Sequence, residues 1–99
     1  MEKRVPTYNL ESIKDAIREG RWSMTFTARR DIFGIGGDDS EAEKIVLSLE
    51  RKDFYKSMTS NGNHKIWQDV YHPEWRKKKL YFKITIDEEG YLLLSLKPK

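Results

Sequence analysis

Apolar side chains in the first part of the chain repeat with the period of an α-helix. In residues 10–19 they fall on one helical face, with Asn9 as a suitable N-cap and Gly20 ending the segment. The residues on this face are Leu10, Ile13, Ala16 and Ile17. The pattern predicts an amphipathic helix over 10–19 that packs one face against a core.

Two shorter helices are predicted before residue 50. Thr25 or Thr27 is a suitable cap for a helix through Phe33, which the glycines of "GIGG" end. A third helix follows Ser40, which forms a capping box with Glu43. Its apolar face consists of Ala42, Ile45, Val46 and Leu49. The stretch "GIGGDD" is then a connector, because a phosphate-binding loop needs a preceding strand and a lysine.

The second half of the chain has the alternation of β-strands. "DFYKSMTS" and "HKIWQDVY" flank "NGN", a strong hairpin signal, and "LYFKITI" and "YLLLSLK" flank "DEEG". The intervening "EWRKKK" is predicted to be a charged connector. Helices followed by strands indicate an α+β fold, in which N-terminal helices pack on a twisted, mainly antiparallel sheet. The length predicts a single domain over 1–99.

The last hairpin has a preferred register. A three-residue loop, residues 88–90, with Gly90 in the left-handed conformation pairs Asp87 with Tyr91 and Tyr81 with Lys97. The same register places Phe82, Ile84 and Ile86 opposite Leu96, Leu94 and Leu92, which forms a continuous apolar face. We therefore expect Tyr81 and Lys97 side by side on the other face.

The first hairpin contains a lysine where the alternation predicts an apolar side chain. Phe54 and Met58 fall on one side of the strand and Lys56 lies between them, where an unpaired ammonium group is costly. A three-residue loop, 61–63, pairs Lys56 with Gln68, and a two-residue Asn-Gly turn pairs it with Trp67. The sequence leaves both registers open.

Composition and charge narrow the class of protein. Three Trp, five Tyr and four Phe argue against disorder, and the absence of cysteine excludes disulfides and thiolate metal sites. The first ten residues lack an apolar run and no run reaches eighteen apolar residues, so we expect no signal peptide, no membrane span and a cytoplasmic protein. Residues 51–99 carry eleven basic and six acidic groups, which favours a polyanionic partner such as nucleic acid.

Lys56, Gln68, Tyr81 and Lys97 form the candidate site. Two ammonium groups can stabilise charge on phosphoryl oxygens, a carboxamide can orient the substrate, and a phenol can exchange protons. Two lysines close together disfavour each other's ammonium forms, which moves their pKa values toward proton transfer. RNA cleavage needs no metal in such a site because the 2′-hydroxyl is an internal nucleophile. The alternative is a solvated sheet edge whose lysines discourage edge pairing.

Other polar and aromatic residues are interpreted as structural. His64 and His72 have no convergent partners in the pattern and are expected at the surface, and no spacing of Asp, Glu and His predicts a metal or cofactor site. The three tryptophans are expected to pack in the core or at its rim. The basic run Arg76 to Lys79 is expected to be a solvated loop that steers a polyanion.

Five segments of the chain carry a family resemblance. "MEKRVP", "DFYKSMT", "IWQDVYHP", "YFKIT" and the closing "SLK" together resemble the MqsR family of bacterial toxins from type II toxin–antitoxin modules. The resemblance implies a RelE-like fold and an mRNA endoribonuclease that cleaves at short GC-containing sites without the ribosome. It also implies that Lys56, Gln68, Tyr81 and Lys97 are the active-site residues. The chain departs from the pattern at His72, where members often have arginine.

The resemblance also implies partners. The substrate is mRNA, and the usual protein partner is an MqsA-type antitoxin with a zinc-binding domain and a helix-turn-helix domain, so zinc and DNA contacts belong to the antitoxin. We expect a metal-independent toxin that cleaves by 2′-hydroxyl attack. The alternatives are a ribosome-dependent nuclease of the same fold and a non-catalytic module that binds RNA or a partner protein.

Overall fold

The computed structural model describes residues 1–60 and 63–98, with the side chains of residues 60, 63, 64, 97 and 98 outside the description. Three α-helices, one 3₁₀ helix (Arg51–Asp53) and seven strands are present in this part of the chain. The helices are α1 (Leu10–Arg18), α2 (Phe26–Gly34) and α3 (Asp39–Leu47). The strands are β1 (Glu2–Lys3), β2 (Trp22–Met24), β3 (Phe54–Ser60), β4 (Asn63–Tyr71), β5 (Glu74–Trp75), β6 (Lys78–Ile86) and β7 (Leu92–Pro98). The predicted α+β class is confirmed.

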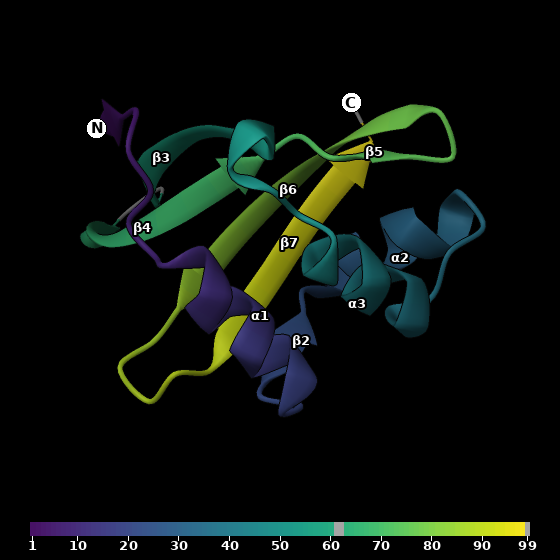
Figure 1. Cartoon of the computed structure of the whole chain (residues 1–99), viewed down its shortest axis with the longest axis horizontal. Helices are drawn as coiled ribbons and strands as arrows, with labels where there is room; N and C mark the ends of the chain where they lie inside the picture. Colours follow the sequence, from purple (N-terminus) through teal and green to yellow (C-terminus); the bar gives the residue numbers. More distant parts are fainter. Residues whose placement is uncertain (61–62, 99) are drawn as a thin grey trace.

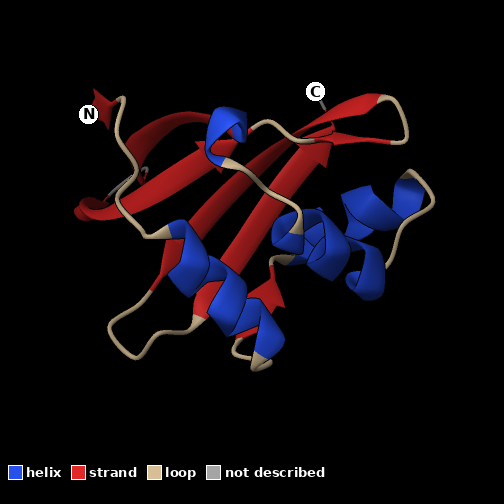
Figure 2. Ribbon diagram, viewed as in Figure 1, coloured by secondary structure: helices blue, strands red, loops and turns tan. Residues whose placement is uncertain are grey.

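The strands form one sheet in the order β1-β3-β4-β6-β7-β2, with β5 paired to β6. All described pairings are antiparallel except the parallel pair of β2 with β7. Figure 1 shows α1 in front of the lower ends of the strands, with α2 and α3 to the right of β7. In Figure 2 the helices gather on one side of the long strands. We call the opposite surface of the sheet the far face.

The caps of the helices explain where each one begins. Asn9 accepts hydrogen bonds from the backbone of Glu11 and Ser12, so the predicted cap of α1 is confirmed. Of the two alternatives for α2, Thr25 is the cap, and it accepts a hydrogen bond from the Ala28 amide. The predicted cap at Ser40 is wrong, because Asp38 is the N-cap of α3 and accepts from the Glu41 amide at 3.0 Å. Carboxylate and hydroxyl oxygens can both accept this bond, so residue type alone did not distinguish the two positions.

The helices and the sheet enclose one buried apolar cluster. The fully buried side chains include Ile13 and Ala16 of α1, Ile32 of α2 and Val46 of α3. The sheet contributes Phe82, Ile84, Leu92, Leu94 and Leu96. Trp22 and Trp75 pack against this cluster while partly exposed, as expected for tryptophans at the rim of a core.

The predicted register of the last hairpin is confirmed. Tyr81 lies opposite Lys97, and Phe82, Ile84 and Ile86 lie opposite Leu96, Leu94 and Leu92. The Asp87 amide donates to the Tyr91 carbonyl at 3.0 Å, and Gly90 has a φ of 80°. Tyr81 belongs to the far face, and the backbone of Lys97 lies directly opposite it in the neighbouring strand.

The observed register of the first hairpin differs from both predicted registers. Lys56 pairs with Val70, and Met58 pairs with Gln68. Ser60 pairs with Asn63, as the two-residue alternative requires, although residues 61–62 lie outside the described residues. The register shifts between Thr59 and Ser60 and again between Phe54 and Lys56, so neither register that assumes unbroken pairing describes this hairpin.

The second irregularity explains the lysine in this strand. Phe54 pairs with Tyr71 and Lys56 pairs with Val70, which places Phe54 and Lys56 on opposite faces of the sheet. Phe54 turns to the core and meets the Tyr71 ring edge-on, with the ring centroids 5.5 Å apart. The expectation that Lys56 interrupts the core face is therefore wrong, since the irregular pairing carries it to the far face with Met58.

The N-terminal segment covers β4 on the helix side. Asp69 is fully buried, and its carboxylate accepts hydrogen bonds from the backbone of Thr7 and Tyr8 at 2.9 and 2.8 Å. The Tyr8 hydroxyl donates to the Trp67 carbonyl at 2.7 Å. These bonds anchor the segment that carries β1, so Glu2 comes to lie beside β3.

The predicted charged connector "EWRKKK" is in fact part of a hairpin. Its first two residues form β5, which pairs antiparallel with the start of β6. Arg76 and Lys77 have φ values of 49° and 66°, the left-handed pair that a tight type I′ turn requires. Arg76 donates to the Gly36 carbonyl at 3.3 Å and lies 4.3 Å from the Trp75 ring, so it is tied to the helix side.

Candidate active site

The register of the strands places the candidate residues in adjacent rows, where a row is a set of residues paired across neighbouring strands. One row runs from Lys56 through Val70 and Lys83 to Ser95. The pairing of Met58 with Gln68 defines the next row on one side, and the pairing of Tyr81 with Lys97 defines a row on the other. Lys56, Gln68 and Tyr81 therefore share one face within three neighbouring rows. The backbone of Lys97 is opposite Tyr81, and its side chain lies outside the description.

Lys56 is held by a carboxylate that the sequence did not indicate. Its ammonium group donates to Glu2, which reaches it from β1 because Glu2 pairs with Met58 at the sheet edge. The Lys56 side chain is 17% exposed and that of Glu2 is 50% exposed. The ion pair fixes the ammonium group at the surface of the far face.

The electrostatics of this pair overturn one expectation. The hydrogen bond to Glu2 raises the pKa of Lys56 above its ordinary value, and the same bond lowers the pKa of the Glu2 carboxyl. The expectation that a neighbouring lysine moves the pKa of Lys56 toward proton transfer is therefore wrong. A lysine is already a cation near neutral pH, and the raised pKa keeps Lys56 in that form, in which it can stabilise negative charge but cannot accept a proton.

His72 connects two tyrosines on this face. Its ring stacks on Tyr55 with the centroids 4.5 Å apart and lies 5.1 Å from the Tyr81 ring at a tilt of 41°. His72 is half-buried, so the expectation of a surface histidine without convergent partners is wrong. One sequence feature could have predicted these contacts. His72 directly follows the strand β4, so it continues that strand opposite Tyr81. The side chain of His64 lies outside the described residues.

Cations flank this row of rings. The Lys56 ammonium and the Arg4 guanidinium each lie 5.3 Å from the centre of the Tyr55 ring. Lys83 lies 5.7 Å from the centre of the Tyr81 ring. Aromatic rings beside cations can stack on unpaired bases while the cations contact phosphates. The far face therefore has the chemical groups to bind a single-stranded polyanion.

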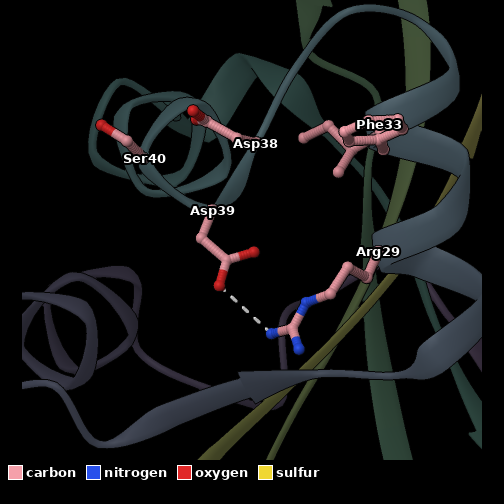
Figure 3. Close-up of a pocket in the computed structure, with 6 residues that line it drawn as sticks. Arg29, Phe33, Asp38, Asp39 and Ser40 are labelled. Atoms are coloured by element: carbon pink, nitrogen blue, oxygen red, sulfur yellow. Dashed lines mark hydrogen bonds and ion pairs between the residues drawn. The ribbon is translucent and has the colours of Figure 1, made fainter.

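One cavity of the described structure lies away from these residues. It has a volume of about 300 Å³ between α2 and α3, and its lining includes Arg29, Phe33 and Ser40. Figure 3 shows the ion pair between Arg29 and Asp39 at its edge, with a distance of 3.2 Å. Arg29 and Asp39 of its lining are paired with each other, and none of the candidate residues lines this cavity.

Among the described residues, no group of three or more His, Asp or Glu side chains is placed to hold a metal ion. None of the helices in the described part of the chain has the length and apolar character to cross a bilayer.

The fold and the far face together define a small α+β protein with a cationic, tyrosine-bearing site on its sheet. A family profile described as "Motility quorum-sensing regulator, toxin of MqsA" matches residues 5–98. The mRNA interferase toxin MqsR of Escherichia coli (strain K12) is 36% identical over 99 residues, covering the whole of both chains. The chain therefore belongs to the MqsR toxin family, as the resemblance of its motifs predicted.

Proposed function

We propose that this chain is an mRNA endoribonuclease, the toxin of a toxin–antitoxin pair, and that its active site is the far face around Lys56, Gln68, Tyr81 and Lys97. The observation that carries the proposal is the placement of Lys56, Gln68 and Tyr81 on adjacent rows of one sheet face. The E. coli relative is named as an mRNA interferase, which supports the same activity.

The proposed reaction uses the RNA's own 2′-hydroxyl as nucleophile. A bond forms between the 2′-oxygen and phosphorus, and the bond from phosphorus to the 5′-oxygen breaks, leaving a 2′,3′-cyclic phosphate. The 2′-hydroxyl loses a proton and the departing 5′-oxygen gains one. The protein must therefore hold the phosphate in line, stabilise its charge and move protons.

Each residue of the site has a proposed part in this reaction. Lys56 stabilises negative charge on the phosphoryl oxygens as an ammonium group that its ion pair with Glu2 holds on this face. Lys97 does the same from the end of β7, and Gln68 orients the substrate. Tyr81 exchanges a proton with the attacking or the leaving oxygen. In this mechanism the protein's own cations supply the charge, so cleavage does not require a metal ion or the ribosome.

The family description also supports a protein partner. The family profile names its members as toxins of MqsA, and we propose a cognate antitoxin of that type. From the resemblance, this partner has a zinc-binding domain and a helix-turn-helix domain, through which any contact with DNA is made. A RelE-like arrangement and recognition of short GC-containing sites belong to the same proposal.

The test is incubation of the purified chain with naked RNA in EDTA, with and without added ribosomes. We expect cleavage without ribosomes and products that end in a 2′,3′-cyclic phosphate. An RNA with 2′-deoxyribose at the cleaved position should bind and remain intact. Cleavage that needs ribosomes would support a ribosome-dependent nuclease, and binding without any cleavage would support a non-catalytic module.

Lys56→Ala tests the site within the same assay. We expect cleavage to fall by about a hundredfold or more, the scale for loss of one preorganised charge stabiliser, with an unchanged circular dichroism spectrum. Lys52→Ala is the matched control, because Lys52 is an exposed lysine nearby in the chain. Equal activity of the two variants would show that Lys56 is not part of the active site. Loss of the circular dichroism signal of the folded chain would show that Lys56 has a structural role.

A further inference from the structure

A small cavity opens beside Tyr81 at the edge of the far face. It has a volume of about 120 Å³ and is lined by Thr27 and Asp31 of α2, Tyr81 and Lys83 of β6, and Ser95 and Leu96 of β7. Thr27 and Asp31 are four residues apart, so they lie on the same side of the helix. The packing of α2 against β7 thus brings a carboxylate and a hydroxyl next to the proposed catalytic tyrosine.

The Asp31 carboxylate retains capacity to accept hydrogen bonds. Its described ion pair is with the neighbouring Arg30, where Nε and Oδ1 are 3.8 Å apart. The Arg30 side chain is 68% exposed and that of Asp31 is 23% exposed, so the pair is long and largely solvated on the arginine side. A carboxylate has two oxygens and about four lone-pair sites, and it can accept two parallel N–H bonds.

We propose that this cavity is a base-binding subsite in which Asp31 recognises guanine. Guanine presents two adjacent N–H donors on its pairing edge, at N1 and N2, which match the two oxygens of a carboxylate. Adenine and cytosine each offer one amino donor there, and uracil places its N–H between two carbonyl oxygens that a carboxylate repels. Proteins read single-stranded RNA on this edge. The inference rests on the proposed function, because it assigns the specificity of the same active site.

The cavity is small compared with pockets that enclose a whole ligand. At about 120 Å³ it is smaller than the roughly 300–1,000 Å³ of pockets that enclose whole small molecules. A flat base can enter while its sugar and phosphate remain outside, next to Tyr81. Ser95 and Thr27 supply hydroxyl groups for the carbonyl oxygen or ring nitrogens of the same base.

The first experiment compares cleavage-site preferences of the full chain and Asp31→Asn. Both proteins cleave a pool of naked RNA, and the cut ends are sequenced. We expect the wild-type chain to prefer guanine at one position near the cut, and Asp31→Asn to reduce that preference by about tenfold to a hundredfold. Preferences at the other positions should be unchanged. Asp15→Asn is the matched control, because Asp15 is an exposed aspartate on α1.

The second experiment removes one functional group of the substrate. Inosine lacks the 2-amino group of guanosine, so placing it at the preferred position removes one of the two donors. Wild-type cleavage should fall by about tenfold, and Asp31→Asn should be insensitive to the exchange. Full tolerance of inosine by the wild-type chain would overturn the subsite even if Asp31→Asn does not fold.

Three outcomes would contradict the proposed subsite. The first is a wild-type chain with no preference for guanine, and the second is a wild-type chain that cleaves the inosine substrate at an unchanged rate. The third is an Asp31→Asn variant that cleaves all substrates more slowly and keeps the wild-type preferences. Each of these leaves the proposed nuclease activity standing. A wild-type chain that cleaves no naked RNA would instead contradict the proposed function, so the two failures are distinguishable.

Discussion

Tyr71 shows how one buried polar group affects the stability of this fold. Its side chain is fully buried, and its hydroxyl has no hydrogen-bond partner within the described part of the chain. Burial raises the pKa of Tyr71 to about 12, from an ordinary value of 10.0. The hydroxyl is thus a cost to the folded state, offset by the packing of the ring against Phe54.

Tyr71→Phe should separate these two effects. Near neutral pH we expect the variant to be as stable as the wild type or more stable by about 1 kcal/mol, because an unpartnered buried hydroxyl is removed. The pKa of the folded state lies above that of the unfolded chain, so the unfolded wild type releases a proton first. Wild-type stability should therefore decline as pH rises from 10 through 12, and the variant should lack this part of the decline.

Urea unfolding of both proteins between about pH 7 and pH 11.5 measures the difference directly. Other groups that titrate in this range are common to the two chains, so their contributions cancel in the comparison. A difference in unfolding free energy that does not change with pH would show that Tyr71 ionises as easily in the folded chain as in the unfolded one.

The last hairpin is the element on which the geometry of the proposed site depends. The Asp87 side chain accepts hydrogen bonds from the backbone of Glu89 and Tyr91, each at 2.9 Å, and Gly90 adopts a positive φ. This turn sets the pairing of Tyr81 with Lys97. A shift of one residue would move Lys97 to the opposite face of the sheet from Tyr81.

Deletion of Glu89 tests that dependence. Only Glu88 and Gly90 would remain in the loop, and a glutamate at the first position of a two-residue turn is unfavourable. The hairpin must strain or slip, and we expect RNA cleavage to fall by about a hundredfold or more. Single-turnover cleavage of a short RNA is the measurement.

Glu89→Ala is the control for the deletion, since it removes the exposed side chain and keeps the loop length. It should cleave RNA at the wild-type rate. A deletion variant that folds and also cleaves at that rate would show that activity does not depend on this register.

At the scale of the whole molecule, positive charge is concentrated in the second half of the chain. Lys77, Lys78 and Lys79 are exposed at the hairpin of β5 and β6, whereas the neighbouring Arg76 is tied to Gly36. The three lysines are therefore the part of the basic run that can attract RNA at a distance.

Replacement of all three lysines by glutamine should slow RNA association. If each lysine contacts a phosphate, the slope of log affinity against log salt should become shallower by up to about 2. Single-turnover cleavage at saturating RNA should be unchanged. A large fall in that saturated rate would place the three lysines in the active site.

A triple variant with the same change in net charge is the control. Lys14, Lys44 and Lys52 lie on α1, on α3 and just before β3, and their replacement by glutamine should alter association less. Equal effects of the two triple variants would indicate that net charge matters and its location does not.

Local sequence patterns were sufficient for much of this architecture. The face of α1, its cap at Asn9 and the register of the last hairpin all follow from contacts between residues close in the chain. The pairing of Tyr81 with Lys97 follows from that register alone, since the turn fixes every pair that lies outward from it. These features were predictable because periodicity and turn chemistry are local and reinforce one another.

Tertiary structure decided what local patterns left open. Irregular pairing in β3 separated Phe54 from Lys56, and β1 brought Glu2 to Lys56 from the other end of the chain. The placement of His72 between the rings of Tyr55 and Tyr81 also depends on strands that are distant in sequence. A β-bulge and a sheet-edge pairing depend on how separate strands align, so no short stretch of sequence contains the information. The sequence by itself therefore determined which residues were candidates, and the assembled sheet determined which of them meet.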